Sequence, residues 1–140
     1  MAIRPHDLES ISPVIATFKI SQTAGVDDLK DTDIGKAVTI SANVTVSPCA
    51  AGDRVLGKLL ALTLTDADDG ERVASVQVGG ICRLSLSGAA PTVGDQVVGG
   101  ASGTVSQAPA LAGNDPAGGN VGRGSTLEVN GSTDCLVLLG

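Results

Sequence analysis

The sequence predicts a small all-β domain, either a barrel or a sandwich. Short runs of alternating apolar and polar residues recur along the 140-residue chain, and turn signals separate them. Glycine contributes 19 residues, and it supplies the positive φ angles that tight turns require. The only aromatic side chain is that of Phe18, so the core has to be built from Val, Leu, Ile and Ala. A chain of this length supports one domain with a core of its own.

Residues 1–20 are expected to form an extended N-terminal arm followed by the first strand. Arg4-Pro5-His6 and Ser12-Pro13 interrupt regular structure, because proline removes an amide donor and restricts the residue before it. A short strand is predicted near Val14–Ile20. The acidic stretch that follows, Val26–Gly35, has room for one helical turn.

The middle of the chain reads as β structure. Residues 37–46 form one β-rich run, with Val38, Ile40, Val44 and Val46 at alternating positions, and Pro48–Gly52 forms a turn. Two further alternating runs, 58–65 and 72–78, flank an Asp-Gly turn at Asp66–Gly70 and predict a β-hairpin. The side chains expected to point inward from this hairpin are Leu60, Leu62, Leu64, Ala74, Val76 and Val78.

The remaining strands complete a body that spans residues 21–140. Strands are predicted at Ile81–Leu86, at Gln96–Val98 and at Thr104-Val105. A Gly-rich surface loop follows at 106–124. The runs 126–129 and 135–139 then form a closing pair of strands around Asn130-Gly131.

The charge balance disfavours nucleic acid as a partner. Nine Lys and Arg stand against 15 Asp and Glu, which gives a net charge of −6 and a pI near 4.4. Phosphate backbones bind proteins through cationic side chains, so an acidic chain is repelled from them.

No apolar stretch is long enough to span a bilayer, and the N-terminus lacks the features of a signal peptide. We therefore expect that the protein does not associate with a membrane. We also expect that it is made in a reducing cytosol. There, Cys49, Cys82 and Cys135 act as buried, reduced thiols.

Several motifs suggest chemistry, but each departs from the pattern that the chemistry needs. Gly52–Lys58 matches the glycine and lysine spacing of a phosphate-binding loop, yet Leu59 replaces the Ser or Thr that would hold magnesium. The acidic residues around Asp66–Glu71 place their glycine at the wrong position for a calcium loop. A second acidic group, Asp27, Asp28, Asp31 and Asp33, is expected to be a solvated face. A catalytic triad would have to use His6, in the predicted arm. We therefore expect no enzyme activity, no metal and no cofactor.

The order and spacing of five segments resemble a known family. These segments are Asp33–Val38, Gly52–Leu59, Ala74–Ile81, Pro91–Val97 and Arg123–Val129. Together they resemble the small capsid decoration, or cement, proteins of tailed bacteriophages, over most of the chain from about Ile15 to the C-terminus.

The resemblance implies a β-tulip-like barrel that sits on the outer surface of the virion capsid, often as a homotrimer. It implies that the protein is made in the cytoplasm of the bacterial host and binds the major capsid protein. Such proteins clamp neighbouring capsid subunits, and the family has no catalytic motif to carry over. The Gly-rich insert departs most from the family pattern.

An extended arm suits this role, because a strand can add to the sheet edge of a neighbour. Our hypothesis is that Ile3, Arg4, Ile11 and Val14 contact the capsid or a neighbouring subunit. A frayed terminus is the alternative interpretation of the same residues.

Other roles remain open from the sequence. A head-fibre base or a tail-tube component would use a similar β scaffold, and a tail protein should form hexameric rings. A Ser–Lys peptidase lacks a local signature. A glycan-binding module is disfavoured because sugars usually stack on aromatic side chains.

Overall fold

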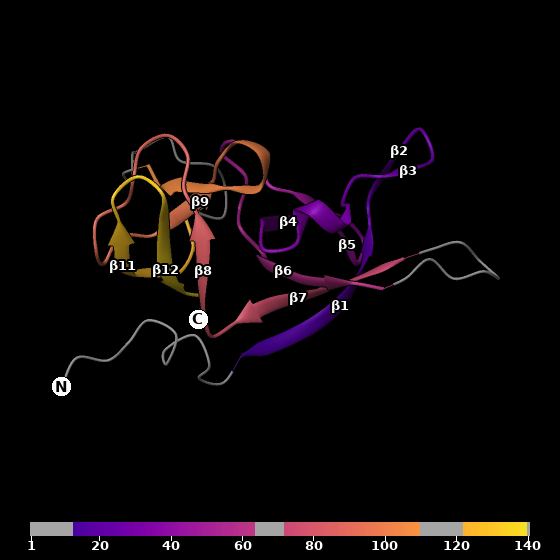
Figure 1. The fold of residues 1–140 in the computed structure, drawn as a ribbon, viewed down its shortest axis with the longest axis horizontal. Helices are drawn as coiled ribbons and strands as arrows, with labels where there is room; N and C mark the ends of the chain where they lie inside the picture. The colour runs from indigo at the N-terminus through magenta and orange to yellow at the C-terminus, as the bar shows by residue number, and fades with distance from the viewer. Residues whose placement is uncertain (1–12, 64–71, 110–121, 140) are drawn as a thin grey trace.

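The computed structural model describes residues 13–63, 72–109 and 122–139. These residues form an all-β fold, as the sequence predicts, and they divide into two lobes that lie side by side (Figure 1). One lobe is a closed five-stranded barrel, and the other combines a three-stranded sheet with a two-stranded sheet. Each lobe has a hydrophobic core cluster of its own.

The barrel lobe closes in the strand order β1-β5-β4-β6-β7. β1 (Val14–Ile20) and β6 (Gly57–Leu62) both lie antiparallel to β7 (Val73–Gly79), while β4 (Ala37–Ala42) lies antiparallel to β5 (Thr45–Pro48). The closure is narrow at two seams, since β1 meets β5 at only two residue pairs and β4 meets β6 at only two. The barrel core consists of Ile20, Leu29, Val38, Val46, Leu59, Ala74 and Val76.

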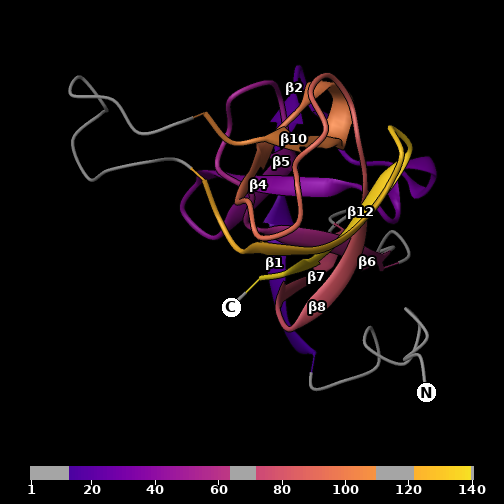
Figure 2. The same ribbon diagram turned by 90° about the vertical axis from the view of Figure 1, so that its left-hand side faces the viewer.

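The second lobe is built on β12 (Asp134–Leu138), which lies between β11 (Ser125–Asn130) and β8 (Ile81–Ser85). β9 (Val97–Gly99) and β10 (Val105–Gln107) form an antiparallel pair beside this sheet. Figure 2 looks onto this lobe, with strands of the barrel behind it. The core of the second lobe consists of Ala37, Cys49, Val55, Cys82, Leu84, Leu86, Val97, Val105, Cys135, Val137 and Leu139.

Short elements decorate the barrel and the second lobe. β2 (Gln22–Thr23) and β3 (Val26–Asp27) form a small hairpin that projects from the barrel end (Figure 1). A single 3₁₀ turn, η1 (Asp31–Asp33), confirms the helical turn predicted in the acidic stretch. A second turn, η2 (Ala101–Gly103), connects β9 to β10.

The prediction of one continuous run over residues 37–46 is wrong. The chain reverses at Asn43 and Val44, so that Ala42 pairs with Thr45 and β4 folds back on β5. Val44 adopts a φ of 50°, a conformation that branched side chains rarely take, and its side chain is exposed. The Thr45 hydroxyl donates a hydrogen bond of 2.8 Å to the Asn43 carbonyl and supports this turn. The reversal has neither Gly nor Pro, so Asn43 alone marks it in the sequence.

The predicted hairpin is confirmed for its two strands, but the inward face of the first strand is not. Leu59 is fully buried, whereas Leu60 is half-buried. A bulge between Leu59 and Ala61 shifts the phase, and Leu62 then packs on the barrel core. An alternation rule applied without the bulge selects the wrong leucine. Ala74 and Val76 of β7 are buried as predicted, while Leu64 and the turn lie outside the described residues.

β1 is the strand predicted near Val14–Ile20, and it belongs to the closed barrel. One predicted boundary moves. The loop predicted at 106–124 begins later than expected, because Ser106 and Gln107 belong to β10. Near its other end, Arg123 forms a bridge with Val97. Residues 110–121 of this loop lie outside the described residues.

Candidate interaction surface

Of the four predicted contact residues, the structure places Val14. It is the first residue of β1, it pairs with Gly79 of β7, and the residue is 56% exposed. Ile3, Arg4 and Ile11 lie outside the described residues. The last residue of the hypothesised contact set therefore lies at the lower end of β1 in Figure 1.

One edge of β1 has no partner strand among the described residues over most of its length. β7 pairs with β1 from Val14 to Lys19, but on the opposite edge β5 reaches only Lys19 and Ile20. The Lys19 amide donates to the Val44 carbonyl at 2.8 Å, which fixes the direction in which this edge faces. Backbone groups alternate along a strand, so Ile15 and Thr17 present their amides and carbonyls to the same side. Within the described ranges, no strand pairs with the segment 14–18 on that side, which we call the β1 edge.

Exposed apolar side chains lie along and beside the β1 edge. Ile15 is 54% exposed and follows Val14, while Val44 is 61% exposed beside Lys19. Phe18 turns the other way and packs against the barrel core. Open strand edges recruit extended segments from other chains, and apolar neighbours strengthen such pairing. The β1 edge is thus a geometrically suitable acceptor for an added strand.

The segment that resembles a phosphate-binding loop serves as a structural connector. It runs from β5 to β6 through the second lobe, where Val55 is fully buried. Three of its amides already have partners: those of Gly52, Asp53 and Leu56 donate to the carbonyls of Gly99, Ala50 and Val38. The segment also leads into the strand β6 and not into a helix whose N-terminus would hold the phosphate, so it lacks the geometry of a nucleotide site.

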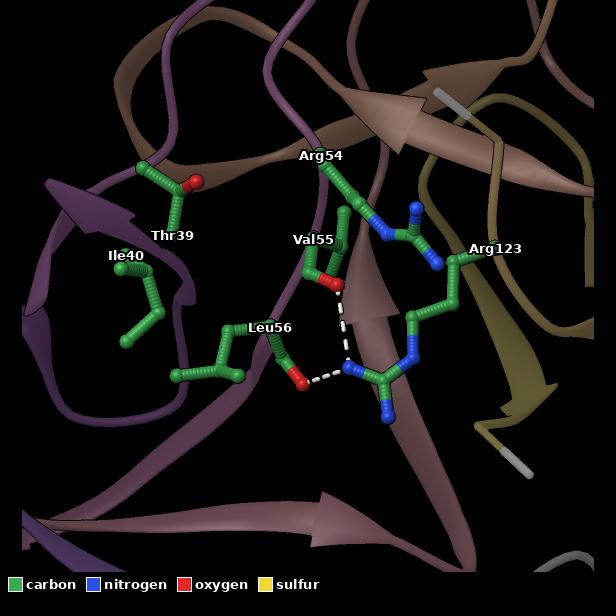
Figure 3. A pocket seen from close by; sticks show the side chains of 6 residues that line it. All are labelled: Thr39, Ile40, Arg54, Val55, Leu56 and Arg123. Carbon is green, nitrogen blue, oxygen red and sulfur yellow. Dashed lines mark hydrogen bonds between the residues drawn. The ribbon is translucent and has the colours of Figure 1, made fainter. Parts of the chain in front are cut away.

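Arg123 joins the two lobes. Its guanidinium donates to the carbonyls of Val55 (3.0 Å) and Leu56, to that of Val78 at 2.5 Å, and to that of Leu139 at 3.3 Å. Figure 3 shows the bonds to Val55 and Leu56. Burial lowers the pKa of Arg123, and the positive charge of Arg54 lowers it further. Arg123 lies in one of the five segments that carry the sequence resemblance. Nothing in the neighbouring sequence predicts its long-range contacts with the connector, β7 and the C-terminal residues.

The acidic group around η1 is tied into local hydrogen bonds. Asp28 accepts from the hydroxyls of Ser21 and Thr23 at 2.6 and 2.8 Å, and these bonds hold its pKa below 3.8. For Asp33, burial alone would raise the pKa, but the Lys36 ammonium, the Lys30 amide and both lysine charges together lower it. These carboxylates are therefore ionised at neutral pH and act as local staples.

The three cysteines are free and buried in the core of the second lobe, as predicted. Burial raises the pKa of Cys49 to about 12, and the charge of Asp53 adds to this effect. Burial likewise raises the pKa of Cys135 to about 11, with a further contribution from Asp134. Both groups are thus protonated thiols at neutral pH and weak nucleophiles.

Within the described residues, no three His, Cys, Asp or Glu side chains gather closely enough to hold a metal ion. His6 and the acidic residues 66–71 lie outside those residues. Among the described elements, none is a helix long and apolar enough to cross a membrane. No family model matches the chain, and searches of curated proteins and of solved structures return no significant match.

Proposed function

We propose that this chain is a capsid decoration protein of a tailed bacteriophage, which binds the outer surface of the head and stabilises contacts between major capsid protein subunits. The observation that carries the proposal is the β1 edge. Among the described residues its backbone groups beside Val14 and Ile15 have no partner strand, and these residues directly follow the segment predicted to be an arm. The sequence resemblance described above points to the same role.

The proposed role is mechanical and assigns no chemical step to any side chain. Strand addition supplies main-chain hydrogen bonds, while the exposed apolar side chains of Val14 and Ile15 add buried area. Each contact is modest on its own. If the protein acts as a homotrimer, binding of one subunit raises the effective concentration of the other two at the capsid surface. The affinity of the trimer then exceeds that of a single contact.

The test measures binding to expanded capsids that lack the protein, by co-sedimentation and electron microscopy. We expect ordered density at regular positions on the shell, and capsids that survive higher temperature when the protein is bound. Failure to bind, together with assembly of the free chain into hexameric rings, would contradict the proposal in favour of a tail role.

Point variants test the β1 edge within the same assay. Ile15→Asp places a charge beside the open edge, and we expect at least a tenfold weaker affinity for capsids. Val93→Asp is the matched control, because Val93 is 63% exposed on a loop of the second lobe. Equal binding by the two variants would remove the β1 edge from the interface.

A further inference from the structure

A second surface feature lies between the lobes, and its lining includes no residue of the β1 edge. A hollow of about 480 Å³ is lined by Thr39 and Ile40 of β4, by Arg54, Val55 and Leu56 of the connector, and by Arg123 (Figure 3). A volume of this size is in the range of ligand sites. It exceeds the space that a few water molecules need.

The hollow concentrates positive charge on a chain whose net charge is −6. In Figure 3 the guanidinium of Arg54 ends beside the base of the Arg123 side chain, while the guanidinium of Arg123 turns toward the carbonyls of Val55 and Leu56. The two residues are close enough that the positive charge of Arg54 lowers the pKa of Arg123. An anion between or beside them would relieve this repulsion.

The two arginines differ in their free hydrogen-bonding capacity. A guanidinium carries five N–H groups, and the backbone carbonyls accept four bonds from Arg123. Arg54 is exposed, and its guanidinium has no hydrogen-bond acceptor within the described residues. Among the described residues no salt bridge joins it to the neighbouring Asp53, whose carboxylate accepts from the Ala50 amide at 2.9 Å. Arg54 therefore offers a complete donor fork, and Arg123 one further N–H.

The rest of the lining favours a carboxylate on an aliphatic stem. A planar fork matches a carboxylate through two parallel hydrogen bonds. Leu56 turns toward Ile40 in Figure 3, and these side chains give the methylene groups of Asp or Glu an apolar contact. A phosphate would meet the same fork but would gain nothing from the apolar side chains of Ile40 and Leu56, and the nearby amides of Gly52, Asp53 and Leu56, which could add to its ligands, already have acceptors.

We propose that this hollow is a binding site for the carboxylate side chain of an acidic peptide segment, with Arg54 as the clamp and Arg123 as a fixed positive charge behind it. The site is separate from the β1 edge and does not depend on the decoration role.

The test follows the Nε–H signals of Arg54 and Arg123 by NMR during titration with a capped peptide that carries two glutamates between glycines. We expect saturable shifts of both signals, and none with the matching glutamine peptide. Arg54→Gln should weaken the affinity at least tenfold. Lys30→Gln removes the same charge from an exposed position on η1's flank and should leave affinity unchanged.

The remaining outcomes are decisive as well. Absence of any shift, or equal weakening by the two variants, overturns the site. Tighter binding of inorganic phosphate than of the glutamate peptide overturns the ligand class. Sedimentation of the protein alone identifies the source of the acidic segment: self-association that Arg54→Gln abolishes supports the site and assigns the segment to a second copy.

Discussion

Protonation of buried thiols is the residue-scale feature with the clearest thermodynamic consequence. Cys49 has an ordinary pKa of 9.0 when exposed, and burial raises it to about 12 in the folded chain. Because the pKa of Cys49 is higher in the folded chain than in the unfolded chain, the contribution of this thiol to the unfolding free energy is complete below pH 9. It is lost as the pH rises from 9 toward 12, because the unfolded chain releases its proton first.

We therefore expect Cys49→Ala to flatten the alkaline loss of stability. Between pH 9 and 10.5 the Cys49 thiol should account for about 2 kcal/mol of lost unfolding free energy, at ~1.4 kcal/mol per pH unit. Urea unfolding at several pH values, under reducing conditions, measures the slope for both chains. The variant starts less stable because it leaves a small cavity, so the slopes and not the absolute values are compared. Equal slopes would show that Cys49 ionises normally in the folded chain.

At the scale of elements, the barrel depends on a close approach between β6 and β7. Gly57 lies against Gln77, and a β-carbon added at Gly57 would stand 1.9 Å from the Gln77 carbonyl oxygen. Gln77 is itself fixed, since its side-chain amide donates to the carbonyls of Gly79 and Ile81 at 3.1 and 3.0 Å. The strand backbone therefore has little freedom to move away.

Gly57→Ala should lower the unfolding free energy by about 1–3 kcal/mol, as overpacked sites do. Lys58→Ala, one residue along the same strand and half-buried, is the control and should cost less. Thermal and urea unfolding of the two variants give the comparison. A Gly57 variant as stable as the control would mean that β6 can separate from β7 without loss.

The elements also show how far sequence reasoning reaches in this chain. Turn residues placed most strands correctly, as for β1, β8 and the pair β11–β12. The sequence did not predict the reversal at Val44 or the bulge in β6, because neither contains a glycine or proline that would indicate it.

The β1 edge and the hollow were harder to predict from the sequence than the strands were. An open edge depends on how far β5 extends alongside β1, and the lining of the hollow depends on Arg123 meeting the connector. Both are long-range events that local periodicity does not encode. Only the apolar character of Val14 was available from the sequence.

For the whole molecule, the decisive question is what joins two lobes with separate cores. Arg123 is the principal polar link among the described residues: its carbonyl partners come from the connector at Val55 and Leu56, from the end of β7 at Val78, and from the C-terminal Leu139. Acceptors that lose a donor and stay out of water cost about 1–3 kcal/mol each. Loss of this guanidinium should therefore weaken the coupling between the lobes.

Arg123→Met should lower the unfolding free energy by about 2–4 kcal/mol, with water repairing part of the loss at this half-buried site. Arg54→Met removes the same charge from an exposed side chain without hydrogen bonds in the described residues and should change stability by less than about 0.5 kcal/mol. Hydrogen exchange resolves the lobes. In the Arg123 variant we expect amides of β8, β11 and β12 to exchange at rates different from those of the barrel, whereas the parent chain opens as a whole. A variant that keeps one shared opening rate in both lobes would show that the apolar contacts between the barrel and the second sheet suffice to couple them.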